Sequence, residues 1–139
     1  MKRLARVAFW FYAIALFVAT HWPNLRIESS HIPRPDIFIH MAVFGGWVML
    51  LVATGYLAPG SDDPLAESRG VRGWLRLVTR PRAVLLAMFV ALAYAALDEL
   101  TQGVPGLGRT VALDDYAANC GGIVAACGAA ALLRFFTRG

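Results

Sequence analysis

Residues 83–102 read AVLLAMFVALAYAALDELTQ, and this stretch decides the fold class. Its first fifteen positions are apolar, and the last five include Asp98, Glu99, Thr101 and Gln102. A bilayer core about 30 Å thick is crossed by about 20 mostly apolar residues of α-helix. The stretch therefore predicts a transmembrane helix that carries acidic and amide side chains at one end.

Three more stretches have this character, so the spans are expected at about 7–22, 37–58, 83–103 and 117–136. The chain is 58% hydrophobic and 16% charged, against about 45–50% and about 25% in soluble domains. This composition disfavours a cytosolic enzyme, a disordered chain and a nucleic-acid partner. Residues 1–139 are predicted to form one domain, an all-α integral membrane protein with four transmembrane helices in an antiparallel bundle.

The basic residues predict the orientation of the bundle. With the N-terminus inside, ten of the 13 Lys and Arg residues flank the spans on the cytoplasmic side, and Arg26, Arg34 and Arg109 lie outside. Cytoplasmic segments of membrane proteins carry an excess of Lys and Arg. Both termini are therefore predicted to be cytoplasmic. His21 and Trp22, at the end of the first span, are expected to anchor it at the outer interface.

Polar side chains inside the spans need a reason, because a central Asp costs about 2.5–3.5 kcal/mol on insertion scales. At about 1.5 Å rise per residue, Glu99, His40 and Asn119 lie about 24, 27 and 26 Å from the cytoplasmic ends of their spans. One cluster near the outer surface is therefore predicted, with these members: Asp36, His40, Glu99, Gln102, Arg109, Asp115 and Asn119.

Helical spacing groups these side chains further. Asp36 and His40 are four residues apart, and Glu99 and Gln102 are three apart, so each pair shares a helix face. Asp98 is expected to face away from Glu99, because adjacent residues do not share a face. On the fourth span one face has polar residues at its start and small residues after them: Asp115, Asn119, Gly122 and Ala126. Small residues let membrane helices approach closely.

The run Glu99-x-x-Gln102, Pro105, Arg109, Asp115-x-x-x-Asn119-x-x-Gly122 resembles the VanZ-like membrane family. That family also has D-K-x-x-H at its second span, of which Asp36 and His40 are present here, with Ile37 in place of the lysine. Ala126 stands where a further glycine is common, and the Gln102-to-Arg109 connection is about one residue longer than usual. The resemblance covers nearly the whole chain.

The resemblance implies a four-helix protein of the bacterial cytoplasmic (inner) membrane with the motif residues in one cluster. The family's namesake is associated with low-level resistance to the glycopeptide teicoplanin. For most members no reaction or ligand is established, so the family name implies little about mechanism.

The residues of the cluster are consistent with three roles. It could bind an amphiphilic or cell-envelope ligand, with the headgroup on Arg109 and the tail between helices. It could be purely structural, with Arg109 paired to Glu99 or Asp115, Gln102 to Asn119, and Asp36 orienting His40. It could also catalyse a reaction on a lipid-linked substrate, with Glu99 as general acid or base.

The catalytic role is the least favoured of the three, because no serine follows Ser68 and no good nucleophile lies near the cluster. No cofactor is expected. His40, Glu99 and Asp115 lack the spacing of a known metal motif, so no metal site is predicted. The oligomeric state is left open.

Overall fold

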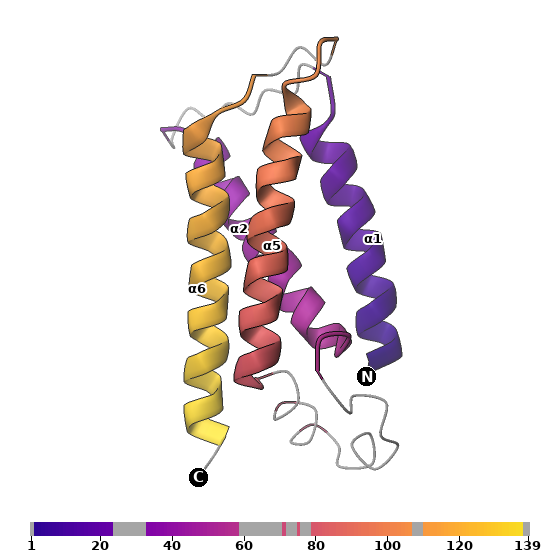
Figure 1. Ribbon diagram of the computed structural model, residues 1–139, viewed down its shortest axis with the longest axis vertical. Helices are drawn as coiled ribbons and strands as arrows, with labels where there is room; N and C mark the ends of the chain where they lie inside the picture. The colour runs from indigo at the N-terminus through magenta and orange to yellow at the C-terminus, as the bar shows by residue number, and fades with distance from the viewer. Residues whose placement is uncertain are drawn as a thin grey trace.

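The computed structural model describes residues 2–23, 33–58, 71, 75, 79–106 and 110–137. Four long helices account for nearly all of these residues, and no strand occurs among them. They are α1 (Lys2–Thr20), α2 (Pro35–Thr54), α5 (Pro81–Gln102) and α6 (Leu113–Thr137), labelled as in Figure 1. Each is long and apolar enough to cross a membrane, so the predicted all-α fold with four spans is confirmed.

The helices start somewhat earlier than the predicted spans, most clearly at α1, which begins at Lys2 rather than at residue 7. Apolar composition marks the part of a helix that lies in hydrocarbon, whereas backbone hydrogen bonding continues into the polar flank. Pro35 and Pro81 each stand at the start of a helix, where their missing N–H costs nothing. Gly55 ends α2 with a positive φ of 73°, a conformation that glycine adopts without strain.

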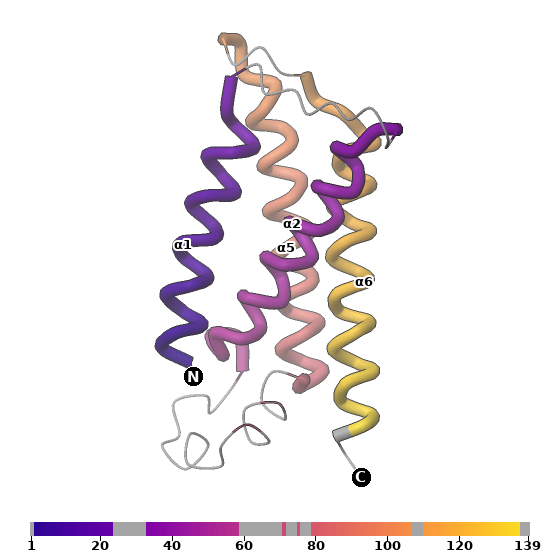
Figure 2. The backbone as a smooth tube through the Cα atoms, turned by 180° about the vertical axis from the view of Figure 1, so that it is seen from behind, coloured from indigo at the N-terminus to yellow at the C-terminus, as the bar shows by residue number. Residues whose placement is uncertain are grey.

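Successive helices run antiparallel, and the two chain termini lie at the same end of the bundle (Figure 1). Seen from behind, α2 crosses the bundle diagonally (Figure 2). Near its start α2 contacts α6 through His40 and Asn119, and near its end Arg6 of α1 donates to the carbonyl oxygen of Thr54. Helix α2 therefore touches a different neighbour at each end.

Glycines allow this crossing at close range. A Cβ atom at Gly122 of α6 would overlap the carbonyl oxygen of Met41 on α2. A Cβ atom at Gly45 of α2 would lie 3.1 Å from the carbonyl oxygen of Gly122, so the two backbones meet directly at this point. The predicted stripe of small residues on the fourth span thus includes a true contact position, Gly122.

Small residues also line the buried face of α5, where Ala87, Ala91 and Ala95 have no exposed surface. Large apolar side chains from the neighbouring helices, among them Phe44 and Ile123, fill the same core. Above Ala95 the buried face becomes polar, with the side chains Asp98, Glu99 and Gln102. The core is therefore apolar through most of its length and polar at the end remote from the termini.

Charge is separated along the bundle in the part of the chain that the structure describes. All five acidic residues lie at the end remote from the termini: Asp36, Asp98, Glu99, Asp114 and Asp115. At the end that carries the termini lie Lys2, Arg3, Arg6, Arg80, Arg82 and Arg134, and Arg34 alone joins the acidic end. The predicted cytoplasmic location of the termini rests on the Lys and Arg residues alone, several of which lie outside the described residues.

Candidate functional site

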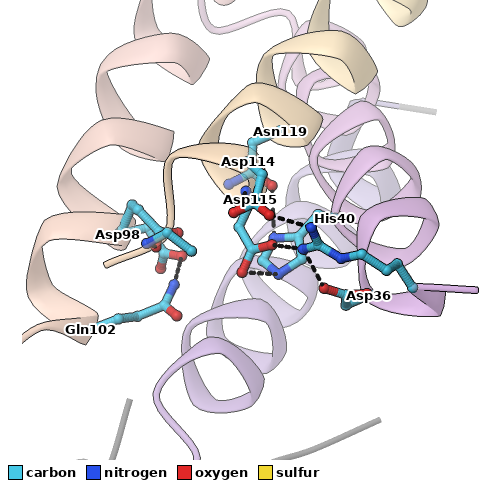
Figure 3. Close-up of polar contacts among 10 residues, drawn as sticks. Asp36, His40, Asp98, Gln102, Asp114, Asp115 and Asn119 are labelled. Carbon is cyan, nitrogen blue, oxygen red and sulfur yellow. Dashed lines mark hydrogen bonds and ion pairs between the residues drawn. The ribbon is translucent and has the colours of Figure 1, made fainter. Parts of the chain in front are cut away.

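The acidic end of the bundle holds two separate polar clusters (Figure 3). The first, called here the α1–α5 cluster, consists of Thr20, His21, Asp98, Thr101 and Gln102. Asp98 is 2% exposed, and its Oδ1 atom accepts a hydrogen bond of 2.9 Å from the Thr20 hydroxyl. Its Oδ2 atom accepts a bond of 3.1 Å from Nε2 of Gln102. Both carboxylate oxygens of this buried acid are therefore bonded within the protein.

His21 completes the α1–α5 cluster. Its Nδ1 atom donates to the carbonyl oxygen of Phe17 over 3.0 Å and lies 3.8 Å from Oδ1 of Asp98. Its Nε2 atom lies 2.9 Å from the hydroxyl oxygen of Thr101. The ring also stacks on Phe17, with 4.2 Å between ring centroids. His21 is thus held by contacts along α1 and by a bond to α5, a role that its predicted position as an interfacial anchor did not reveal.

The second cluster, called here the α2–α5–α6 cluster, consists of His40, Glu99, Asp115 and Asn119. Nδ1 of His40 donates a 2.9 Å hydrogen bond to Oδ1 of Asn119, which is fully buried. Nε2 of His40 lies 3.7 Å from Oδ2 of Asp115, one turn before Asn119 on α6. The imidazole therefore lies between two side chains of α6, as Figure 3 shows.

Glu99 joins this cluster from α5. It is 3% exposed, and its Oε1 atom accepts a 2.6 Å hydrogen bond from the backbone N–H of Ala112, directly before α6. The carboxylate thereby points to the first turn of α6, where it interacts electrostatically with Asp115 and with His40 of α2. Asp98 and Glu99, adjacent on α5, consequently serve different neighbours, the first α1 and the second α6.

Several buried atoms of the α2–α5–α6 cluster have no hydrogen-bond partner. They are Oε2 of Glu99, Oδ1 of Asp115 and Nδ2 of Asn119. One other buried side-chain atom of the described residues is in this state, Nε1 of Trp47, which lies in the apolar core. A buried polar group without a partner costs about 1–3 kcal/mol. No such atom occurs in the α1–α5 cluster.

Arg34 lies beside the second cluster. Its guanidinium donates to Asp36 over 3.1 Å and to Asp114, and it lies 3.7 Å from Oδ1 of Asp115. The hydrogen bonds that Arg34 donates to Asp114 and Asp36 raise the pKa of its guanidinium. Arg34 also has a positive φ of 52°, uncommon for a residue with a side chain.

The predicted cation of the cluster, Arg109, lies outside the described residues, and Arg34 was not among the predicted members. The only available signal was its place just before Asp36. Arg34 thus supplies a cation beside Asp115, the acid that lies 3.7 Å from His40.

The predicted members of the single cluster thus divide between two places. His40, Glu99, Asp115 and Asn119 come together as expected. Gln102 bonds to Asp98 and not to Asn119, because it lies on the face of α5 that turns toward α1. Asp36 accepts from Arg34 at the surface, and Asn119 takes the role of orienting His40 that the structural interpretation gave to Asp36.

Within the described parts of the chain, no group of three or more His, Cys, Asp or Glu side chains could hold a metal ion. Comparison of the whole chain with protein-family models, with curated proteins and with solved structures gave no match.

Proposed function

We propose that this multi-pass membrane protein binds the headgroup of an amphiphile, a membrane lipid or a related cell-envelope molecule, in the α2–α5–α6 cluster. The observation that carries the proposal is that three buried polar atoms of this one cluster, on Glu99, Asp115 and Asn119, have no hydrogen-bond partner. More than about 90% of buried polar groups in proteins find a partner. A ligand that supplies the missing partners explains the exception.

The position of the cluster suits an amphiphile. It lies at the polar end of a bundle whose outer surface is apolar, and at the same level of α5 Leu97 and Leu100 are exposed on the outer side of the helix, each by more than 60%. A headgroup in the cluster would leave its acyl chains along such apolar helix faces. This arrangement keeps the polar part of the ligand near the membrane interface and its tail in hydrocarbon.

The proposal extends to family and location. The spacing of Glu99, Gln102, Asp115 and Asn119 supports a VanZ-like protein, and the basic end that carries the termini supports a cytoplasmic location for them. The protein would then lie in the bacterial cytoplasmic membrane with the cluster facing outward. A link to glycopeptide (teicoplanin) resistance belongs to the same proposal.

A second candidate is a structural or interaction protein whose polar side chains only fix helix packing. The α1–α5 cluster favours it, because Asp98 joins α1 to α5 with every oxygen bonded. The two candidates differ in what they expect of Glu99. A structural Glu99 contributes to stability, whereas a ligand-binding Glu99 contributes mainly to the response to lipid.

The test is the melting temperature of the purified protein in mild detergent, with and without added bacterial polar lipids. A ligand that binds the native state raises this temperature. The variants are Glu99→Gln, which keeps an oxygen for the Ala112 N–H, and the matched Asp36→Asn at the surface of the same end. We expect polar lipid to stabilise wild type and Asp36→Asn, and to stabilise Glu99→Gln much less. An equal response in all three proteins would refute the proposed function.

A further inference from the structure

We infer that the α2–α5–α6 cluster takes a primary ammonium group, such as the headgroup amine of an aminophospholipid. This inference rests on the proposed function and names the chemistry of its ligand. It follows from the kinds of atom left without partners. Two are carboxylate oxygens, which only accept hydrogen bonds when ionised: Oε2 of Glu99, and Oδ1 of Asp115, which lies 3.7 Å from the Arg34 guanidinium but receives no hydrogen bond. The third, Nδ2 of Asn119, only donates.

The two carboxylate oxygens can bond only to a ligand that carries hydrogen-bond donors. A primary ammonium carries three N–H donors and no acceptor, so one such group can bond to more than one carboxylate oxygen. A trimethylammonium group has the same charge and no N–H, so it leaves these oxygens unbonded. A phosphate alone brings acceptors only, and it would be repelled by Glu99 and Asp115.

Charge favours a cation at the same place. Of the described residues at this end, five are acidic and one, Arg34, is basic, and its guanidinium already pairs with Asp36, Asp114 and Asp115. Glu99 is nearly fully buried and has no Lys, Arg or His within ion-pair distance in the described chain. A buried carboxylate is costly unless a positive group pairs with it. A ligand ammonium supplies that charge.

The amide of Asn119 indicates that the ligand also carries a hydrogen-bond acceptor. Because Nδ1 of His40 donates to Oδ1 of Asn119, the free atom of the amide is its Nδ2 donor. This donor can bond to an acceptor of the same ligand, such as a phosphate or ester oxygen of the headgroup. His40 is therefore a positioning residue, which fixes the direction of the amide without touching the ligand.

The experiment compares phospholipids with identical acyl chains, each titrated into the full-length protein in mild detergent while its melting temperature is followed. The probes are phosphatidylethanolamine, phosphatidylcholine and phosphatidylglycerol, with soluble phosphoethanolamine as a fourth. We expect phosphatidylethanolamine to bind with an apparent Kd about tenfold or more below that of phosphatidylcholine. Glu99→Gln should remove this preference, and the matched Asp36→Asn should keep it.

The outcomes separate the inference from the proposed function. If all three phospholipids stabilise the protein equally and Glu99→Gln abolishes every response, the cluster binds headgroups without reading the amine, and only the inference fails. If neither lipid nor Glu99→Gln changes the melting temperature, both fail. If phosphoethanolamine alone reproduces the Glu99-dependent shift, amine recognition holds and the ligand need not be a lipid.

Discussion

Asp98 and Glu99 are neighbours on one helix, are equally buried, and belong to two clusters that differ in how completely they are bonded. Asp98 has both oxygens bonded, to Thr20 and Gln102. Glu99 has one oxygen bonded, to the N–H of Ala112, and the other buried without a partner. Burial of a carboxylate in a membrane protein therefore does not by itself indicate a binding site. The informative feature is the atom that the protein leaves unbonded.

Helix geometry explains why adjacent residues differ so much. Successive residues point about 100° apart around a helix of 3.6 residues per turn, so Asp98 turns to α1 while Glu99 turns to α6. On the side facing α1, the hydroxyl of Thr20 and the amide of Gln102, one turn along α5, both donate to Asp98. On the second side α6 presents another acid, Asp115, which cannot donate to Glu99 when both are ionised.

The largest effect is expected from Gly122→Ala, which should disrupt the α2–α5–α6 cluster and leave the α1–α5 cluster intact. The new methyl would overlap the Met41 carbonyl oxygen, so α2 and α6 must separate and His40 must leave Asn119. Overpacking costs about 1–3 kcal/mol and more where backbone is the obstacle. We expect a loss of at least about 3 kcal/mol in unfolding free energy.

The matched control for this variant is Gly128→Ala on the same helix, where nothing lies within 4 Å of the added Cβ atom. Its unfolding free energy should stay at or slightly above that of wild type, because alanine favours helix. Equal stability of the two variants would contradict the close approach of α2 and α6.

Asp98→Ala tests the fully bonded cluster and comes next in size. It leaves the Thr20 hydroxyl and the Gln102 amide buried without their acceptor, at about 1–3 kcal/mol for each. We expect a total loss of about 3 kcal/mol, measured by denaturant unfolding in detergent. Thr20→Val removes only one donor and should cost about 1 kcal/mol. Unchanged stability in both variants would show that the cluster does not hold α1 to α5.

Glu99→Gln should have a much smaller effect on stability, which sharpens the contrast with Asp98. The amide oxygen still accepts from Ala112, and a buried charge is removed. Replacing groups in a binding site often leaves stability unchanged or raises it by about 0.5–2 kcal/mol. We expect a change between zero and a gain of about 1 kcal/mol in lipid-free detergent. A loss as large as that of Asp98→Ala would make the two clusters equivalent.

Arg34→Gln is expected to change stability least. Its side chain is 52% exposed and its ion pairs are open to solvent, and such pairs contribute little and are screened by salt. Any decrease in melting temperature at low ionic strength should vanish at about 1 M salt. A decrease that persists at high salt would mean that Arg34 supports Asp115 inside the cluster and not only at its edge.

Apolar composition predicted the four helices, because bilayer thickness sets the length of an apolar run regardless of which helices pack against it. Depth arithmetic also placed His40, Glu99 and Asn119 together, since equal depth on neighbouring helices needs only the rise per residue. The partners of Asp98 could not be predicted, because they depend on how α1 and α5 are rotated about their axes. Arg34 was missed because two of its partners, Asp114 and Asp115, lie about 80 residues away on another helix, and the sequence does not show which side chains of α6 face it.

Each cluster joins residues that are far apart in the sequence, and this has a consequence for biosynthesis. Thr20 and Asp98 are 78 residues apart, and His40 and Asn119 are 79 apart. Because the chain is made from its N-terminus, Thr20 is already in the membrane when Asp98 arrives together with Gln102. The α1–α5 bonds can therefore form on a three-helix intermediate. His40 and Glu99 find their partners only on α6 and on Ala112 directly before it, and these residues are made last. The proposed binding cluster can therefore form only once synthesis of the bundle is finished.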